Sequence, residues 1–112
     1  MTDKSKKYLS DILIAIELIE KFTVDVLDFK AYQEDLKTQS AVERQLSIIG
    51  EALNQFKKAE PDISIENAAQ IIGFRNRLVH AYGSIDNAIV WAIINIHIRK
   101  LKTEVENKFG VR

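Results

Sequence analysis

Apolar side chains recur every three or four residues along most of this 112-residue chain. That spacing puts them on one face of an α-helix, whereas a half-buried strand would alternate apolar and polar residues. Four segments carry the helical pattern: about residues 5–22, a stretch that ends near residue 58, a stretch between the turn at 61–64 and Gly83, and about residues 86–107. Short connections between them predict an all-α fold, an antiparallel four-helix up-and-down bundle.

Composition agrees with a helical protein that forms one domain, residues 1–112. Proline occurs once, glycine four times and cysteine not at all, and a chain of this length normally has one core. The lack of cysteine excludes disulfides and fits a reducing cytoplasm. No apolar run approaches the roughly 20 residues of a membrane span, and the start does not look like a signal peptide. We therefore expect a cytoplasmic protein without a membrane segment.

The charges balance, with 16 basic and 16 acidic residues and a formal net charge of +0. This balance excludes a strongly basic nucleic-acid binder at the level of the whole chain. It leaves room for a local basic groove, particularly one at the seam of a dimer.

Caps and turns predict where the helices begin and end. Ser40 and Glu43 have the spacing of a capping box. Tyr32 and Leu36, however, continue the apolar stripe backward, so we expect one long second helix that begins before Leu36. A short extra helical turn is expected in the first connector, residues 23–31. For the later helices the expected signals are an N-cap at Asp62 or Ser64, a stop at Gly83, and a further N-cap at Ser84 or Asp86.

Two features indicate how the helices pack. Gly50 lies inside the second helix, where glycine costs roughly 1 kcal/mol against alanine, and a close approach of another helix is the expected reason for it.

The fourth segment is apolar on nearly every side from Ile89 to Ile98. Such a helix is buried on more than one side, and in a short chain the simplest second surface is another copy. We therefore predict a homodimer with this helix near the interface.

Residues 75–82 read Arg-Asn-Arg-Leu-Val-His-Ala-Tyr and combine three kinds of side chain that suit phosphate chemistry. Arginine binds phosphate through paired hydrogen bonds, histidine transfers protons near neutral pH, and tyrosine offers a hydroxyl. Phosphodiester cleavage by these groups requires neither a metal nor another cofactor. From the chemistry alone, a structural role near a helix end is the commoner use of such an Arg and His.

Helical geometry separates the members of this motif. At about 100° per residue, Arg75 and Tyr82 fall on nearly the same face, while His80 lies about 140° from Arg75. Arg75 and His80 therefore meet at one ligand only if the helix unwinds before His80 or if a second chain completes the site. In a dimer, two copies of His80 could act as base and acid on opposite sides of one phosphate, with Arg75 stabilising the transition state.

Other polar and aromatic side chains have a candidate function beside a plain structural role. Asn76 could position a phosphate, and Glu51 could either orient an arginine or be an ordinary surface carboxylate. Arg77 could contact the backbone of a nucleic acid or be a solvated helix residue, and we favour the backbone contact. His97 has no neighbour at metal-ligand spacing and is expected to pack in the core or an interface. Trp91 is also expected to pack, although an exposed Trp91 could stack on a base.

A resemblance to a known family lies in residues 71–82, which read Ile-Ile-Gly-Phe-Arg-Asn-Arg-Leu-Val-His-Ala-Tyr. This segment resembles the signature of HEPN-domain ribonucleases, specifically the HepT-like toxins of HepT/MntA toxin–antitoxin systems. Their pattern is Arg, four residues, His, any residue and Tyr, usually with Asn after the Arg. Residues 43–53 resemble the second-helix block of the family, and residues 8–12 resemble its start. The positions that match the motif are Arg75, Asn76, His80 and Tyr82.

The resemblance implies an all-α dimer whose two Arg-His motifs face a shared cleft, with Arg75 and His80 as catalytic residues. It implies metal-independent endoribonuclease activity on mRNA or tRNA, and a role as a toxin. It also implies a partner, an MntA-type nucleotidyltransferase antitoxin that transfers AMP from ATP to Tyr82. The sequence leaves two other classes open: a non-catalytic HEPN-type module that binds RNA or nucleotide or regulates a nucleotidyltransferase, and a plain structural dimeric bundle.

Overall fold

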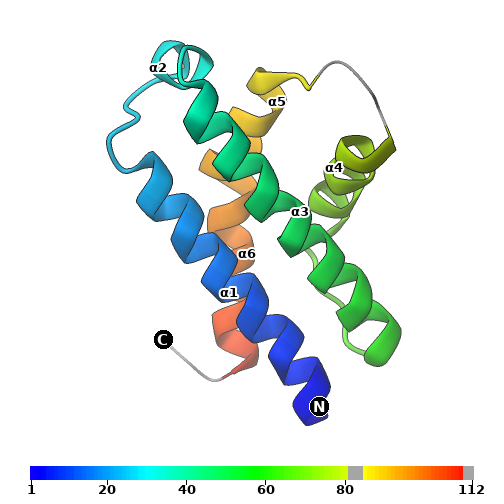
Figure 1. Ribbon diagram of the computed structural model, residues 1–112. Coiled ribbons are helices and arrows are strands. Elements are labelled where there is room, and N and C mark those ends of the chain that lie inside the picture. Colours follow the sequence, from blue (N-terminus) through cyan, green and yellow to red (C-terminus); the bar gives the residue numbers. More distant parts are fainter. Residues whose placement is uncertain (81–84, 110–112) are drawn as a thin grey trace.

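The computed structural model of the protein describes residues 1–80 and 85–109, with the backbone alone described at 78–80. Helices occupy most of this part and no strand occurs in it: α1 (Asp3–Thr23), α2 (Phe29–Gln33), α3 (Leu36–Ala59), α4 (Ala69–His80), α5 (Asn87–Ala92), the π-helical turn η1 (Ile93–His97) and α6 (Ile98–Lys108). The prediction of an all-α fold is confirmed. The long helices alternate in direction, so the start of α1 and the end of α6 lie at the same end of the bundle (Figure 1).

The predicted apolar stripes form the core. α1 and α3 pack against each other along most of their lengths, and the final helix packs behind them. Burial of each side chain of this size contributes about 1.5–3 kcal/mol, which offsets the entropy lost when the helices form. The fully buried residues of the first pair of helices include Leu9, Ile12, Ile16 and Ile19 on α1 and Leu46, Ile49, Leu53 and Phe56 on α3.

The start of α1 is attached to the end of α3 through one carboxylate. The Thr2 hydroxyl caps α1 by accepting from the backbone N–H of Ser5. The hydroxyl of Ser5 donates to Oε2 of Glu60 at 2.6 Å, and the backbone N–H of Thr2 donates to the same oxygen at 3.2 Å. These donors, first the Ser5 hydroxyl, lower the pKa of Glu60. The N-terminal turn is therefore fixed by more than its own capping bond.

The expectation of one long helix that begins before Leu36 is wrong. α2 and α3 are separate, and the break is made by Asp35, whose side chain caps α3. Its carboxylate accepts from the backbone N–H of Thr38 at 3.0 Å and from the Thr38 hydroxyl at 2.6 Å, and these bonds lower the pKa of Asp35. Ser40 lies inside α3, so its capping-box spacing with Glu43 marks no helix start. The expected extra helical turn of the first connector is confirmed as α2, at residues 29–33.

The third helix begins later than expected. α4 starts at Ala69, so neither Asp62 nor Ser64 stands at its N-cap. The chain before it is held instead by Glu104 of α6, which accepts from the backbone N–H groups of Glu66 at 2.7 Å and Asn67 at 3.1 Å. At the start of the next helix, the side chain of Asp86 caps α5 by accepting from the backbone N–H of Ala88, as predicted. The expected stop at Gly83 and the alternative cap at Ser84 lie outside the described residues.

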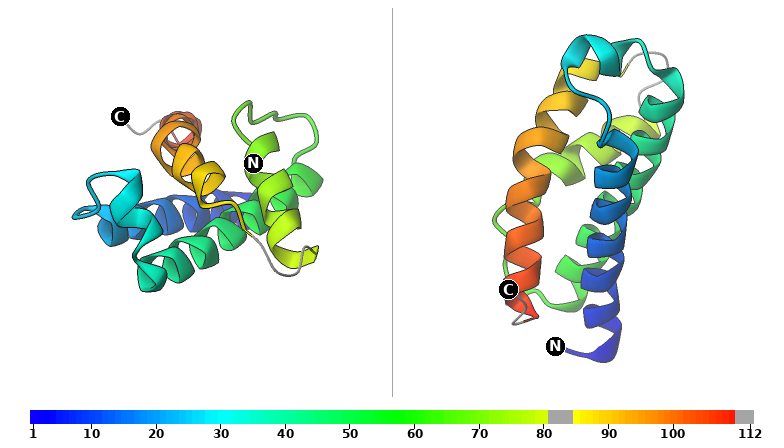
Figure 2. Two further views of the ribbon diagram at one scale, coloured as in Figure 1. Left: turned by 90° about the horizontal axis from the view of Figure 1, so that it is seen from above. Right: turned by 90° about the vertical axis from the view of Figure 1, so that its left-hand side faces the viewer.

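α5, η1 and α6 form one continuous helix from Asn87 to Lys108, and its middle turn is wider than an α-helical turn. In the right-hand view of Figure 2 this helix runs the length of the molecule, with α4 lying across it. It contacts α1, α2 and α4 of its own chain. Its apolar surface is therefore buried on several sides without a second copy, although Ile96 remains 50% exposed. Among the described residues, no helix is long and apolar enough to cross a membrane.

Tyr32 of α2 connects the small helix to this long one. Its ring is fully buried and lies 5.4 Å from the ring of Trp91, close enough for a favourable aromatic contact. Its hydroxyl is buried and has no hydrogen-bond partner among the described residues. Burial, with smaller contributions from Glu43 and Asp35, raises the pKa of Tyr32 far above its usual value. The ring stabilises this corner of the bundle and the hydroxyl does not.

Tyr32→Phe is therefore expected to leave stability unchanged or to raise it by about 1 kcal/mol, because a desolvated, unpaired hydroxyl is removed. Tyr32→Ala, which removes the ring as well, is expected to cost about 3–5 kcal/mol. Urea denaturation of the three proteins measures both effects. A loss of more than 1 kcal/mol in the Phe variant would show that the hydroxyl has a partner.

Candidate functional site

The motif arginine is placed by a close crossing of α3 and α4. A Cβ atom added to Gly50 of α3 would lie 2.8 Å from Cγ of Arg75, closer still to its Cβ, and 3.4 Å from the carbonyl oxygen of Ile71. Real Cβ atoms do not approach other atoms as closely as 2.8 Å, so only glycine leaves room for the stem of Arg75. The expectation of a close helix approach at Gly50 is confirmed, and the helix that approaches carries the motif.

The guanidinium group of Arg75 is held by side chains on both helices. Its Nη2 lies 3.0 Å from Oε2 of Glu51, and its Nη1 donates to Oδ1 of Asn76 at 3.2 Å. The other carboxylate oxygen of Glu51 accepts from Nε2 of Gln55 at 3.2 Å. The Arg75 and Glu51 side chains are 24% and 44% exposed, and solvent screens an ion pair of this exposure. The pair therefore adds little to stability and mainly fixes the direction of the guanidinium group.

One nitrogen of this group is desolvated. Nε of Arg75 is buried and has no hydrogen-bond partner among the described residues. An unsatisfied buried donor of this kind costs about 1–3 kcal/mol. The close crossing at Gly50 imposes this cost, and the two terminal nitrogens are left as the part of Arg75 that faces outward.

A pocket of about 330 Å³ opens beside the guanidinium group, between α1, α3 and α4. The sequence motif identified only part of its wall. The rest of the wall consists of side chains spaced three and four residues apart along α3 and α1. That helical spacing is the sequence pattern from which they could have been predicted. These additional wall residues are Tyr8, Asp11, Arg44, Ser47, Ile48, Ala52 and Gln55.

The remaining motif residues do not all join this pocket. Arg77 lines a different pocket, on the other side of α4. α4 continues as an α-helix to His80, so the first of the two alternatives for His80, an unwound helix, is wrong for this chain. Positions 75 and 80 stay about 140° apart around the helix axis. Tyr82 lies outside the described residues.

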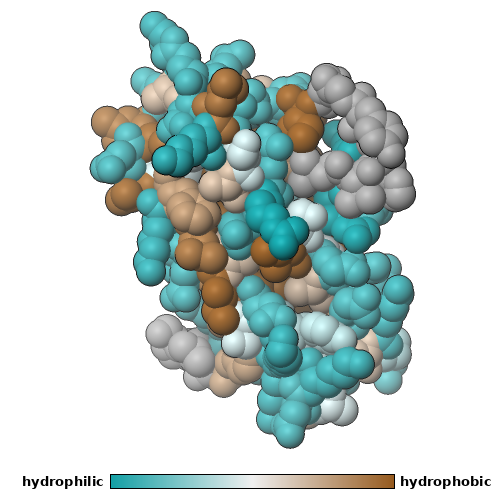
Figure 3. Space-filling model, viewed as in Figure 1, coloured by the Kyte–Doolittle hydropathy of each residue, from teal (hydrophilic) through white to brown (hydrophobic). Residues whose placement is uncertain are grey.

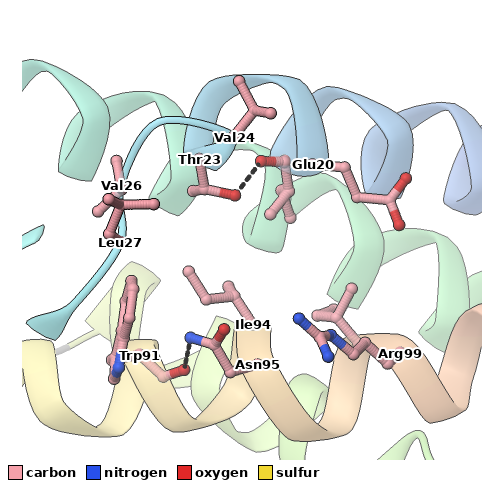
Figure 4. A pocket seen from close by; sticks show the side chains of 11 residues that line it. Glu20, Thr23, Val24, Val26, Leu27, Trp91, Ile94, Asn95 and Arg99 are labelled. Atoms are coloured by element: carbon pink, nitrogen blue, oxygen red, sulfur yellow. Dashed lines mark hydrogen bonds between the residues drawn. The ribbon is translucent and has the colours of Figure 1, made fainter.

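A larger cavity, of about 540 Å³, lies away from this site, between the end of α1, the following connector and the last helix. In Figure 4, Val26 and Leu27 lie above Trp91 at one end of it, and Arg99 lies near the other. Trp91 is packed against Phe29 and Tyr32, as expected for a packing residue. Within the described residues, no three His, Cys, Asp or Glu side chains are grouped so that they could hold a metal ion.

Fold and site together define a class of protein, an all-α bundle in which the arginine of an Arg-x4-His motif lies against a glycine of the preceding long helix. The chain belongs to the HepT-like ribonuclease family, because the family model described as ribonuclease HepT-like matches residues 12–107.

Curated relatives agree with this membership. A Thermococcus cleftensis protein named probable ribonuclease HepT is 41% identical over 110 residues, covering 95% of this chain and 96% of that protein. A Methanocaldococcus jannaschii protein named as an RNase is 34% identical over 105 residues, covering 90% and 93%. A longer protein of the same organism, whose name joins a gamma-glutamylcyclotransferase to an RNase, is 33% identical over 104 residues, covering 89% and 45%. No solved structure matches the chain significantly.

Two glycine-to-alanine substitutions are expected to change stability in opposite directions. Gly50→Ala puts a methyl group into the stem of Arg75, so the helices must separate, at a cost of about 1–3 kcal/mol. Gly73 of α4 has no atom within 4 Å of an added Cβ, so Gly73→Ala is expected to stabilise the helix by about 0.5–1 kcal/mol. Urea denaturation of both variants beside the parent protein checks the two signs. Stabilisation by both substitutions would contradict the close crossing.

Proposed function

We propose that the protein is a metal-independent endoribonuclease toxin that cleaves mRNA or tRNA in the cytoplasm. The observation that carries the proposal is the fixed guanidinium group of Arg75 at the wall of an open pocket, in a chain whose relatives are named as ribonucleases. Arg75 is the first residue of the motif in which His80 supplies a proton-transferring group.

Hydrogen-bond counting supports phosphate binding by Arg75. Each terminal nitrogen of a guanidinium group carries two N–H donors. Glu51 and Asn76 engage one terminal nitrogen each, so one donor on each nitrogen is left for a ligand. Donors on two nitrogens can bind two phosphate oxygens, and arginine binds phosphate in that bidentate way. Glu51 is then a positioning residue and Asn76 a second one.

The chemistry requires a base and an acid on opposite sides of the phosphate. A base takes the proton of the 2′-hydroxyl, the oxygen attacks phosphorus, and an acid gives a proton to the departing 5′-oxygen, leaving a 2′,3′-cyclic phosphate. One His80 cannot do both in a single step, and positions 75 and 80 are about 140° apart around the axis of α4. Two copies of His80 in a dimer cleft supply both groups, while Arg75 stabilises the negative charge of the transition state.

An apolar band beside the pocket supports a second copy at this face. Ile14 follows Asp11 by one helical turn on α1 and is 53% exposed, and Ile48 and Tyr8 in the pocket wall are partly exposed. Figure 3 shows hydrophobic side chains in a band over the part of this face where α1 lies. Exposed apolar bands of this kind are typical of protein interfaces. The homodimer therefore stays a proposal, with its support on α1 rather than on the fourth helix alone.

Control by a nucleotidyltransferase partner of the MntA type completes the proposal. Tyr82 follows Arg75 by seven residues, and AMP transferred from ATP to its hydroxyl would place a phosphate near the arginine, with release of pyrophosphate. That phosphate would occupy or block the donors that an RNA phosphate requires. The enzyme would then be inactive until the adduct is removed.

A second function is favoured by one observation. Arg75 already has a carboxylate partner in Glu51. A non-catalytic module that binds RNA or nucleotide, or that regulates a nucleotidyltransferase, has the same geometry. Cleavage assays separate the two functions.

The first test is RNA cleavage in the presence of EDTA. The parent protein is expected to cleave single-stranded RNA, Arg75→Ala to lose about 100- to 1000-fold in rate, and His80→Ala to lose about 100- to 10,000-fold. Glu51→Gln is expected to lose less than Arg75→Ala, because the guanidinium group remains but is no longer held. Binding of RNA without cleavage would favour the non-catalytic function, and cleavage that survives both single substitutions would remove Arg75 and His80 from the mechanism.

Subunit mixing tests the composite site in the same assay. A fixed amount of parent protein is mixed with an equal amount of His80→Ala chain, and the subunits are allowed to exchange. Random pairing then leaves half of the parent chains in parent dimers. If each cleft requires both copies of His80, the activity should fall to about half. Independent sites would leave that activity unchanged. A Lys100→Ala chain, altered on an exposed part of α6, is the matched control and should have no effect.

The second test concerns Tyr82. Incubation with a neighbouring nucleotidyltransferase and ATP is expected to add the mass of AMP to the intact chain and to abolish cleavage. Tyr82→Phe is expected to prevent both changes, whereas Tyr8→Phe, which alters a tyrosine on α1, is expected to prevent neither. An adduct that persists in Tyr82→Phe would assign the modification to another side chain.

A further inference from the structure

The pocket that contains Arg77 lies between α4 and the last helix and has a volume of about 360 Å³. Its polar groups are the side chains of Gln70 and Arg77 from α4 and His97 from η1. Its apolar wall includes Phe74 and Ile93. His97 is one of only two histidines in the chain, and it belongs neither to the motif nor to the buried core.

The charge of this pocket differs from that of the two pockets described above. None of the described residues that line it carries a carboxylate, whereas Asp11 and Glu51 line the Arg75 pocket and Glu20 lines the cavity of Figure 4. Among the described residues, no ion pair or side-chain hydrogen bond engages Arg77 or His97. In a chain with equal numbers of acidic and basic residues, a pocket lined by basic groups without acidic ones favours an anion.

The π-helical turn aligns one wall of this pocket. In an α-helix, a residue four positions further on lies about 40° past the first, so a row at spacing four drifts around the axis. A π turn closes with i→i+5 bonds and takes more residues, which removes most of that drift. Ile89, Ile93 and His97, at successive spacings of four, consequently all line this pocket. The wide turn thus brings a histidine to the side of the helix that faces α4.

The two arginines of the motif, Arg75 and Arg77, lie on different sides of α4. Positions 75 and 77 are about 200° apart around the helix axis, and each side chain lines its own pocket. One phosphate therefore does not contact both arginines of one chain. Gly73 lies on the Arg77 side, and because an added Cβ would have no atom within 4 Å, the backbone there is open to a ligand.

We propose that the pocket between α4 and η1 is a second nucleotide subsite for single-stranded RNA, remote from the Arg75 pocket, with the phosphate on Arg77 and His97. The base lies against the apolar wall beside Phe74 and Ile93, and the Gln70 amide, which both donates and accepts, faces its edge. This inference rests on the proposed function, because it takes RNA as the ligand. It gives Arg77 a defined place in substrate binding rather than in catalysis.

The chemistry of the wall separates a nucleotide from an acidic peptide. A carboxylate side chain would satisfy Arg77 alone, and it would leave the apolar surface and the Gln70 amide without a partner. A nucleotide combines an anion, a flat apolar face and a hydrogen-bonding edge, which are the three features that this wall offers. A short acidic peptide is therefore the competing ligand to be measured.

The experiment measures binding of the full chain to a fluorescent single-stranded RNA whose 2′-hydroxyls are methylated, so that it cannot be cleaved. Arg77→Ala is expected to weaken binding about 10-fold or more, through the loss of a charge-assisted hydrogen bond, and to reduce the slope of log K against log salt by about 0.7. Gly73→Leu, which fills the pocket without removing any charge, is expected to weaken binding to a similar extent. His97→Ala should weaken binding less, because an imidazole offers fewer hydrogen-bond donors than a guanidinium group.

Matched variants separate the subsite from general effects of charge and fold. Arg99→Ala and Lys100→Ala each remove a cation from an exposed part of α6 outside this pocket; both are expected to bind within about twofold of the parent. Far-ultraviolet circular dichroism checks that the Leu variant remains helical. Equal weakening by Arg99→Ala and Arg77→Ala, parent-like binding by Gly73→Leu, or equally tight binding of poly-glutamate would each overturn the proposal.

The result is distinguishable from a failure of the proposed nuclease. If methylated RNA binds through Gly73 and Arg77 while unmethylated RNA is never cleaved, the subsite stands and the ribonuclease proposal fails. If unmethylated RNA is cleaved and Arg77→Ala and Gly73→Leu retain the parent kcat/KM, the subsite fails and the ribonuclease proposal stands. Where both proposals hold, the two substitutions raise KM and leave kcat nearly unchanged.

Discussion

The contact between Gly50 and the stem of Arg75 is the constraint on which the rest of the site depends. It fixes how closely α4 approaches α3, and so decides that the guanidinium group reaches Glu51 one residue further along α3. A methyl group at position 50 would move α4 as a unit, because the Cβ of Arg75 and the backbone of Ile71 are both in contact with that point. The glycine in the middle of α3 therefore costs about 1 kcal/mol of helix propensity relative to alanine, and it leaves the room that the stem of Arg75 occupies.

The long last helix depends on a different device. Its apolar residues are distributed around the axis, and three other helices of the same chain take up the different sides. A regular helix would rotate residues at spacing four steadily away from any one neighbour. The π turn at Ile93–His97 interrupts that rotation in the middle of the helix, so α4 meets a straight row of side chains there. Two pockets with different charge then lie on opposite sides of the short helix that carries the motif.

Sequence periodicity was sufficient for the helical class, for most of the core and for the cap at Asp86, because each depends on local spacing. It failed where two local signals competed. Tyr32 and Leu36 continue an apolar stripe, but the Asp35–Thr38 cap breaks the helix between them. It also failed where a distant residue decides the outcome, because the carboxylate of Glu104 on α6 replaces an N-cap for α4. The pairing of Arg75 with Glu51 was one of two readings and needed the helix crossing to decide it. The π turn leaves no residue pattern that could have revealed it, and the separation of Arg77 from Arg75 follows from helical angles alone.

The up-and-down path has a consequence for gene architecture. The start of α1 and the end of α6 lie together, at the end of the bundle away from the end of α4 (Figure 1). Extra polypeptide joined at either terminus would therefore be attached at the end of the bundle that lies away from the end of α4. The bundle is thus suited to become a module in a longer chain, and the Methanocaldococcus jannaschii relative whose name joins a gamma-glutamylcyclotransferase to an RNase, more than half of which lies outside the match, has that kind of architecture.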